Sequence, residues 1–366
     1  MTKSDSEPRA PLVGTVVAVQ ANYYRVHLEP PPLSPSPPLP SLATCSPPSL
    51  LCTRRSRLKK IGQQVMVGDR VIVAEPDWAG GRGAIAQVLP RQTELNRPPI
   101  ANTNQILLVF ALVDPPLDAY QLSRFLVKAE STDLDICLCL NKSDLATPEQ
   151  LQSTGDRLQS WGYQPLFVSV KTGTGLFALR SALQQKITVL AGLSGVGKSS
   201  LINQLIPGIN LRVGEVSGKL NRGRHTTRHI ELFELPTGGL LADTPGFNQP
   251  DLECTVEELV YYFPEAQQRL AVARCQFNDC LHRDEPNCAV RGDWERYQHY
   301  LDFLEEVSEF QEQLNQKAEP ESSLKVMTKS KGHQYEPKLE TKKYRRLSRR
   351  TQQQGLQELY QDAEEM

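Results

Sequence analysis

Residues 187–205 read ITVLAGLSGVGKSSLINQL, which is a short apolar run, a glycine-rich turn and a stretch with helical periodicity. The turn fits the pattern G-x-x-x-x-G-K-[ST], in which backbone N–H groups at a helix N-terminus converge on phosphates. Lys198 is expected to reach the β- and γ-phosphate oxygens, and the Ser199 hydroxyl to bind Mg²⁺. The predicted contacts are Gly192, Leu193, Ser194, Gly195, Val196, Gly197, Lys198, Ser199 and Ser200. This segment predicts a nucleotide-binding α/β domain.

Two further loops indicate that the base is guanine. Asn141-Lys142-Ser143-Asp144 follows the apolar run ICLCL, and the next run, LFVSV, ends in a loop that contains Ser169 and Lys171. The Asp144 carboxylate can accept hydrogen bonds from both N–H groups on the guanine edge, which adenine lacks, while the Asn141 amide secures the loop. Lys142 is expected to lie along the base plane. GTP is therefore the expected ligand.

The segment Asp243-Thr-Pro-Gly246 supplies the magnesium and γ-phosphate side of the predicted site. Asp243 is expected to hold Mg²⁺ through water, and the Gly246 N–H to contact the γ-phosphate. Between this segment and the phosphate loop lies the candidate first switch, residues 223–227, where either Thr226 or Thr227 binds Mg²⁺. Thr227 is the favoured candidate.

The residue that positions the attacking water is not obvious from the sequence. Phe247 follows Gly246 at the place where many GTPases carry a glutamine that orients water. Phenylalanine has no group that can do this, so His225 in the first switch is the candidate catalytic residue. The alternative is that His225 is a solvated or RNA-contacting loop residue.

These loops occur in a rotated order along the chain. Ordinary small GTPases present the phosphate loop first and the guanine-binding loops last, whereas here the guanine-binding loops, 141–144 and 169–171, precede residues 192–199. Six short apolar runs between Ile100 and Asp243 alternate with helical stretches, which is typical of a largely parallel, doubly covered sheet. We expect a circularly permuted GTPase domain over residues 98–250.

The N-terminal region is expected to form a small β-barrel of the OB type over residues 11–97. After a disordered segment 1–10, residues 11–28 alternate apolar and polar residues around Ala21-Asn22, as a hairpin does, and 65–91 suggest three more strands. Residues 30–50 are rich in proline and are expected to form an extended loop. OB folds often bind oligonucleotides. The basic residues Arg54, Arg55, Arg57, Lys59 and Lys60 would suit that role or form a solvated loop.

A helical, zinc-binding domain is expected over residues 251–330. Its cysteines follow the pattern C-x4-C-x-H-x5-C, and three thiolates with one imidazole suit a closed, tetrahedral structural zinc site. The alternative is a chance cluster of free thiols. Cys137 and Cys139 fit buried thiols, while Cys45, Cys52 and Cys254 show no ligand pattern. The predicted ligands are Cys275, Cys280, His282 and Cys288.

Residues 331–366 are expected to form a basic C-terminal tail with no strands. Lysines, arginines and two tyrosines gather in 331–350, a composition suited to phosphate contact and base stacking, although such runs are usually solvated. The net charge of the chain is -1, so only local clusters indicate a nucleic-acid partner. Neither a bilayer-spanning apolar run nor a secretory signal is evident, so we expect a cytoplasmic protein without membrane association, and a monomer.

The segments LPRQTELNRP, NKSDL, GLSGVGKSSLIN, GRHTTRH and DTPGF, together with the cysteine cluster, resemble the RsgA/YjeQ family over nearly the whole chain. The resemblance implies an OB fold, a permuted GTPase and a zinc domain in that order. It also implies a histidine at the place of His225, and binding to 16S-type rRNA on the small (30S) ribosomal subunit late in its maturation. Slow hydrolysis of GTP to GDP and phosphate, stimulated by the subunit, is the expected activity.

Two other functions fit parts of the sequence. A GTP-binding RNA chaperone or scaffold with incidental turnover would be consistent with Phe247. An ATP-dependent phosphate-loop enzyme would explain residues 192–199 but not Asp144. Turnover with and without small subunits separates the first from a GTPase, and nucleotide competition tests the second.

Overall fold

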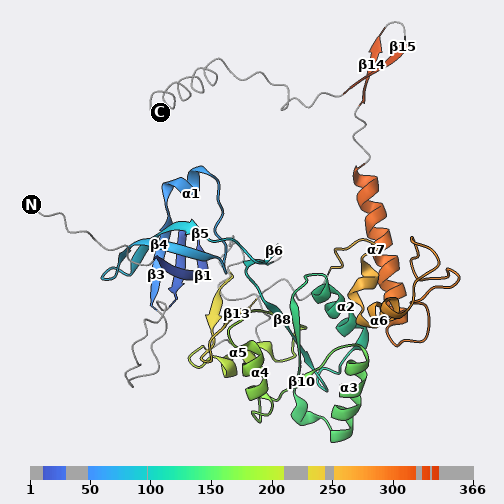
Figure 1. The fold of residues 1–366 in the computed structure, drawn as a ribbon, viewed down its shortest axis with the longest axis horizontal. Helices are drawn as coiled ribbons and strands as arrows, with labels where there is room; N and C mark the ends of the chain where they lie inside the picture. Colours follow the sequence, from blue (N-terminus) through green and yellow to red (C-terminus); the bar gives the residue numbers. More distant parts are fainter. Residues whose placement is uncertain are drawn as a thin grey trace, which may run out of the picture. The chain divides into compact units, whose positions relative to one another are not determined.

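The structure, a computed structural model, describes residues 11–29, 48–96, 98–209, 230–243, 251–318, 324–329 and 332–337 (Figure 1). The chain divides into two compact units, Met1–Glu305 and Glu306–Met366. The predicted disordered start, 1–10, and most of the proline-rich loop lie outside the described residues.

The N-terminal region is a closed five-stranded barrel, as expected. Its strands are β1 (Leu12–Gln20), β2 (Tyr23–Leu28), β3 (Ser49–Arg54), β4 (Arg70–Asp77) and β5 (Arg82–Val88), in the order β1-β2-β3-β5-β4. The predicted hairpin closes with Gln20 opposite Tyr23, and β4 pairs with β1. Alternate residues point inward, so that Val16, Val26 and Ile85 have no exposed surface.

Two details of the barrel differ from the prediction. Residues 65–91 contain two strands, not three, because the remaining strand, β3, lies before them at Ser49–Arg54 and pairs in parallel with β5. The basic run continues from β3 into the short helix α1 (Ser56–Lys60). Proline content masked the strand signal, since β3 begins directly after Pro47 and Pro48. A small hairpin, β6 (Glu94–Asn96) and β7 (Pro99–Ala101), then leads into the next domain.

The central domain is built on a six-stranded sheet in the order β10-β9-β8-β11-β13-β12. Five strands are parallel and only the edge strand β12 is antiparallel, so the predicted α/β architecture is confirmed. The six predicted apolar runs correspond to the strands β8 (Gln105–Ala111), β9 (Asp135–Asn141), β10 (Leu166–Phe167), β11 (Ile187–Ala191), β12 (Leu232–Glu234) and β13 (Leu240–Asp243).

Helices bury both faces of this sheet. Helices α2 (Ala119–Glu130) and α3 (Pro148–Ser160) share one core with Leu108 and Phe110 of β8. Helices α4 (Leu176–Leu183) and α5 (Lys198–Leu205) share the other core with Leu107 and Val109. Every residue of β8 is buried, which is why the strand reads as a continuous apolar run.

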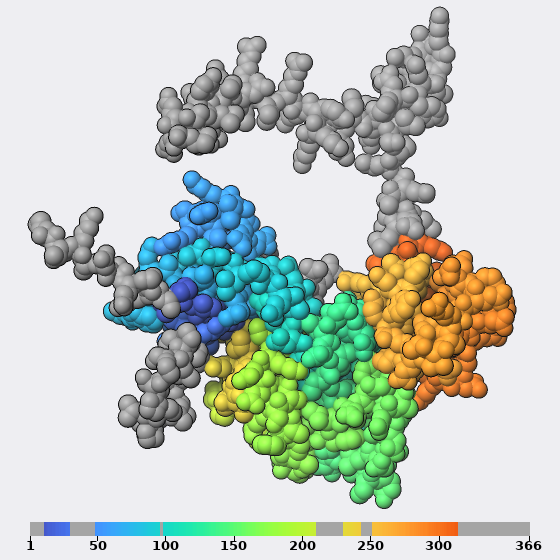
Figure 2. Space-filling model, in the orientation of Figure 1, coloured from blue at the N-terminus to red at the C-terminus, as the bar shows by residue number. Residues whose placement is uncertain are grey.

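The region after the sheet is helical with one long loop. It contains the 3-10 helix η2 (Leu259–Tyr262), helix α6 (Pro264–Val272) and helix α7 (Tyr297–Ala318). Residues 273–296, all of which the structure describes, form no helix or strand. In Figure 2 the orange atoms of this region lie against the green helices of the central domain, where Arg157 at the end of α3 pairs with Glu295.

The expectation that no strand follows the cysteine cluster is wrong. Strands β14 (Leu324–Lys329) and β15 (Gly332–Pro337) form an antiparallel hairpin in which Lys329 pairs with Gly332. The β-branched Val326 and Thr328 favour strand structure, a signal that the high lysine content of the segment concealed. Among the described residues, no helix is both long enough and apolar enough to cross a membrane.

Candidate functional site

The parallel strands end at a common edge of the sheet, and those parts of the predicted motifs that the structure describes lie there. Residues Asn141, Ala191 and Asp243 end β9, β11 and β13, while Ala111 ends β8 between β9 and β11. In open α/β sheets ligands bind beyond the carboxyl ends of the strands. The rotated order of the motifs is therefore compatible with one site, because the strand order in space brings distant segments together.

The phosphate loop joins β11 directly to α5. Gly197 has a left-handed conformation (φ 95°) and precedes the first helical residue, Lys198. A Cβ atom on Gly192 would lie 2.1 Å from the carbonyl oxygen of Val109, so only glycine permits this close approach to β8. The Lys198 ammonium donates to the carbonyl oxygens of Gly192 at 2.8 Å and Leu193 at 2.5 Å. The carbonyl oxygens of the loop therefore surround the ammonium group of Lys198.

The side chain of Asn141 connects the base-side loops to the phosphate loop. It is 2 % exposed, and its Nδ2 donates to the carbonyl oxygen of Val196 at 2.8 Å, while its Oδ1 accepts from the Val170 N–H at 3.4 Å. A Cβ on Gly197 would lie 2.4 Å from the same Nδ2. One buried amide therefore holds three loops that are up to 55 residues apart in sequence.

Asp144 is held in place by the second base-side loop. The Ser169 hydroxyl donates to Asp144 Oδ1 at 2.6 Å, and the Ser143 N–H donates to the carbonyl oxygen of Val168 at 3.1 Å. Ser169 is buried whereas Asp144 is exposed. The carboxylate is thus oriented from behind and remains accessible from solvent.

Lys142 contacts a residue that sequence reasoning did not identify. Its backbone is left-handed (φ 60°), and its ammonium donates to the carbonyl oxygen of Asp114 at 2.5 Å and lies 3.5 Å from the Asp114 carboxylate. Asp114 follows β8, whose carboxyl end lies beside that of β9. This position after a neighbouring parallel strand was the signal that could have found it.

The other predicted residues divide into two groups. Lys171, Ser194 and Gly195 are exposed at the sheet edge, Ser199 and Ser200 lie in the first turn of α5, and Asp243 pairs with Leu190 as the last residue of β13. His225, Thr226, Thr227, Gly246 and Phe247 lie outside the described residues.

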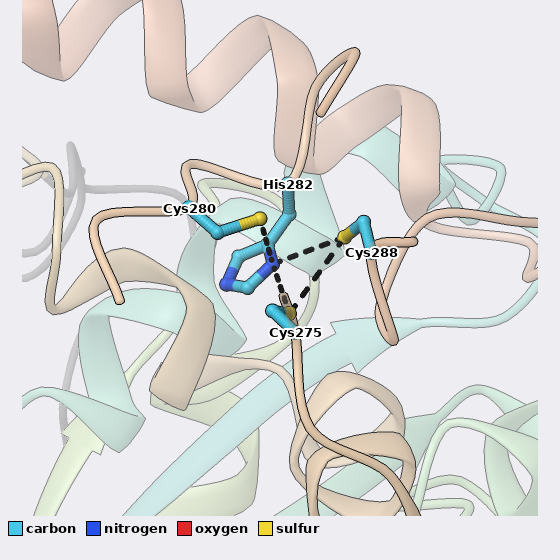
Figure 3. Close-up of side chains that lie close together, drawn as sticks. All are labelled: Cys275, Cys280, His282 and Cys288. Carbon is cyan, nitrogen blue, oxygen red and sulfur yellow. Dashed lines mark hydrogen bonds between the residues drawn. The ribbon is translucent and has the colours of Figure 1, made fainter. Parts of the chain in front are cut away.

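The four predicted zinc ligands come together in the loop between α6 and α7 (Figure 3). The Nδ1 atom of His282 lies 3.5, 3.4 and 3.3 Å from the sulfur atoms of Cys275, Cys280 and Cys288. The Cys275 and Cys288 sulfurs are 3.9 Å apart. Bonds of about 2.3 Å from a tetrahedral zinc ion give sulfur separations of about 3.8 Å. The cluster is compatible with one such ion.

The surroundings of this cluster also suit a metal centre. The N–H groups of Ala289 and Arg291 donate to the sulfurs of Cys275 and Cys288 at 3.4 and 3.3 Å, as is common around metal-bound thiolates. Burial lowers the pKa of His282, which favours the neutral imidazole that binds metals. Burial raises the pKa of Cys280 to about 12, so a nearby cation is needed to stabilise its thiolate.

Sequence reasoning missed the side chains that support this loop. The Glu285 carboxylate accepts from the N–H groups of Leu281 and Arg283, and the Tyr300 hydroxyl donates to the carbonyl oxygen of Leu281. Behind the loop, the buried Arg296 pairs with Glu265 and lies over the ring of Trp161. An acidic residue between ligands and aromatic residues in a helix are too common to indicate these contacts in advance.

Comparisons with known proteins agree with this arrangement. Residues 88–253 match the family model described as RsgA GTPase. Proteins named small ribosomal subunit biogenesis GTPase RsgA from Trichormus variabilis and RsgA 1 from a Nostoc species are 70 % and 68 % identical to the chain, each match covering 96 % of this chain and 98 % of the relative.

Solved structures extend this likeness to the fold. The crystal structure of YjeQ from Thermotoga maritima is 32 % identical, covers 82 % of this chain and 99 % of its own, and superposes with a TM-score of 0.66. The structure of YloQ, a circularly permuted GTPase, is 31 % identical, covers 82 % of this chain and 96 % of its own, and gives 0.65. The chain therefore belongs to the RsgA family of circularly permuted GTPases.

Proposed function

We propose that this chain is a GTPase that acts in the biogenesis of the small ribosomal subunit. The observation that carries the proposal is the Asn141 side chain, which ties the predicted guanine loops to the predicted phosphate loop. The names of the close relatives support the same role. Guanine recognition rests on the Asp144 carboxylate, which Ser169 orients.

The chemistry proposed for the phosphate side uses residues at the sheet edge. Lys198 exchanges the carbonyl oxygens of Gly192 and Leu193 for phosphate oxygens, and Ser199, Asp243 and Thr227 hold Mg²⁺. When bound by these residues, Mg²⁺ would supply positive charge close to the phosphate oxygens. N–H groups at the start of α5 and at Gly246 bind phosphate oxygens, and His225 positions the attacking water.

One structural zinc ion is proposed at Cys275, Cys280, His282 and Cys288. Four protein ligands fill a tetrahedral shell and leave no position for water, so the ion stabilises the loop and takes no part in hydrolysis. The thiolates and the neutral imidazole supply the ligand charges that zinc prefers.

We further propose that the subunit partner is recognised through 16S-type rRNA, with the barrel and the basic segment 331–350 in contact with phosphates. Basic residues of β3 and α1 support an electrostatic contribution. Because each neutralised phosphate releases a counterion, binding to small subunits should weaken steeply as salt rises. A flat salt response would contradict this part of the proposal.

The test is GTP turnover by the purified chain with and without small ribosomal subunits. Slow turnover that the subunit accelerates supports the GTPase. Measurable GTP binding with turnover that the subunit leaves unchanged would instead favour the RNA chaperone or scaffold. His225→Ala is expected to abolish most of the stimulated rate while nucleotide binding persists.

A further inference from the structure

The barrel contacts β12, the strand that follows the first switch in the sequence. β12 is the edge strand of the central sheet, and its inner side pairs with β13, with Leu232 opposite Ala242. On its outer side, Glu231 forms an antiparallel bridge with Ala18 of β1. The barrel therefore covers an edge that would otherwise present unpaired backbone groups.

Apolar side chains fill this contact. Val17 of β1 is 1 % exposed and belongs to the same hydrophobic core as Ile230 and Leu232, together with Val67 and Ile100 from the barrel end of the chain. A core shared in this way is bistable rather than continuously deformable, so movement of β12 shifts the barrel or breaks the contact.

An ion pair specifies where the barrel meets β12. Arg25 stands opposite Ala18 in the β1–β2 pairing, and its Nη1 lies 2.9 Å from Glu231 Oε1, with both side chains a little under half exposed. A second contact, between His27 Nδ1 and Glu234 Oε2, is longer at 3.7 Å. Burial and the nearby Arg25 lower the pKa of His27, which keeps it neutral, so the electrostatic tie rests on Arg25 and Glu231.

The position of Glu231 in the chain gives this contact its meaning. Glu231 follows Thr227 by four residues, and β13, the partner of β12, ends at Asp243 of the D-x-x-G segment. The hairpin β12–β13 thus runs from the end of the first switch to the start of the second. The first switch and the D-x-x-G segment, which are both expected to respond to the γ-phosphate, are therefore attached to one hairpin. The barrel contacts the outer edge of this hairpin.

We propose that Arg25 is a positioning residue which acts through Glu231 on the first switch, so that barrel placement and nucleotide state are coupled. The inference rests on the proposed GTPase function. A coupling of this kind requires that the Arg25–Glu231 contact differ in strength between the GTP and GDP states. By reciprocity, an rRNA partner that engages the barrel then shifts the preference of the chain between the two nucleotides.

Charge reversal tests the pair directly. The variants are Arg25→Glu, Glu231→Arg and the double reversal, and the readout is the ratio of affinities for a non-hydrolysable GTP analogue and GDP in the isolated chain. Each single reversal should change this ratio about two- to fivefold, the size expected for a half-exposed ion pair, and the double reversal should restore it. A merely structural role would lower both affinities together and leave the ratio unchanged.

The matched control is Arg70→Glu. This change breaks a similarly exposed ion pair between two residues of the barrel domain, in which Arg70 Nη2 lies 2.8 Å from Glu29 Oε2. This variant should leave the ratio as in the wild type. Single reversals that behave like Arg70→Glu, or a double reversal that fails to recover, would overturn the proposal. GTP turnover of the wild-type chain with and without small subunits is measured in parallel. If the subunits do not stimulate turnover, the proposed function fails, whereas the affinity ratios of the charge-reversal variants still test the coupling through Arg25 and Glu231.

Discussion

The guanine-side loops and the cysteine loop are both irregular segments that hold polar side chains, yet they keep their shape by different means. Asn141 ends the parallel strand β9 and Ser169 follows the parallel strand β10, and both side chains bond to other protein groups, so this site is assembled before a ligand arrives. The loop of residues 273–296 has no helix or strand of its own, and the three cysteines that gather around His282 repel one another as thiolates. The difference teaches that the sheet organises the first site, whereas the cysteine loop depends on the zinc ion that we propose for it.

Removal of the proposed zinc ion should have the largest effect on structure, and it should affect the cysteine loop but not the guanine-side loops. Chelation of zinc is expected to release about one ion per chain and to unfold the loop, because binding of a structural zinc contributes on the order of 10 kcal/mol. Guanine nucleotide binding should persist. Metal analysis with hydrogen exchange over 273–296 and over β8 measures both parts.

The corresponding variant is Cys280→Ser, with Cys254→Ser as its control, since Cys254 lies outside the cluster. Only the first should lose zinc. Full metal content in Cys280→Ser would show that the cluster is not the zinc site.

The next largest effect is expected for Asp144→Asn. Loss of charge-assisted hydrogen bonds to two guanine N–H groups should weaken GTP binding about 100-fold, or about 3 kcal/mol. The asparagine N–H can instead donate to the second carbonyl oxygen of xanthine, so the variant should prefer xanthosine triphosphate. Competition binding measures the exchange, and Asp156→Asn on the exposed side of α3 serves as the control. An unchanged guanine preference would remove Asp144 from the site.

Asn141→Ala should weaken GTP and GDP binding about 10-fold each. The change removes the bonds to Val196 and Val170 and leaves one buried and one partly buried backbone group without this partner, at a cost of about 1–2 kcal/mol. Equilibrium titration of both nucleotides, with zinc content as a reference, is the measurement. If Asn141→Ala lost zinc but kept its nucleotide affinity, Asn141 would support the cysteine loop and not the nucleotide site, contrary to the proposal.

Ser169→Ala should have the smallest effect. The Asp144 carboxylate keeps its charge but loses one orienting hydrogen bond, so the affinity for GTP should fall about fivefold, or about 1 kcal/mol. Ser153→Ala on α3, which removes a hydroxyl bonded only to the local helix backbone at Gln150, is the control. Identical titrations for both variants would show that Ser169 does not position Asp144.

The sequence was sufficient for the features that depend on local pattern. The strands β8, β9 and β11 follow from continuous apolar runs, and the loops after them follow from glycine and polar residues at fixed spacing. The cluster of three cysteines and His282 follows from the spacing of these residues. Such signals are contained within short segments.

The sequence was insufficient where contacts join distant segments or where composition concealed the pattern. Neither the Lys142–Asp114 contact nor the Arg25–Glu231 pair has a local signature, because each depends on which strands become neighbours. Strand β3 was hidden by the adjacent prolines, and the hairpin β14–β15 by its lysines. In both cases the prolines or lysines argued against a strand, and the alternation of apolar and polar residues was given too little weight. Whether such a segment forms a strand depends on its pairing with a second strand, which the local sequence does not show.

The central claim is that one guanine nucleotide site forms from motifs that the chain presents in rotated order. Hydrolysis of GTP and ATP by the purified chain, each in competition with the other nucleotide, tests it most directly. The account predicts turnover of GTP that excess ATP does not inhibit, and little turnover of ATP. Equal turnover of both nucleotides, or inhibition by ATP at the concentration at which GDP inhibits, would contradict it.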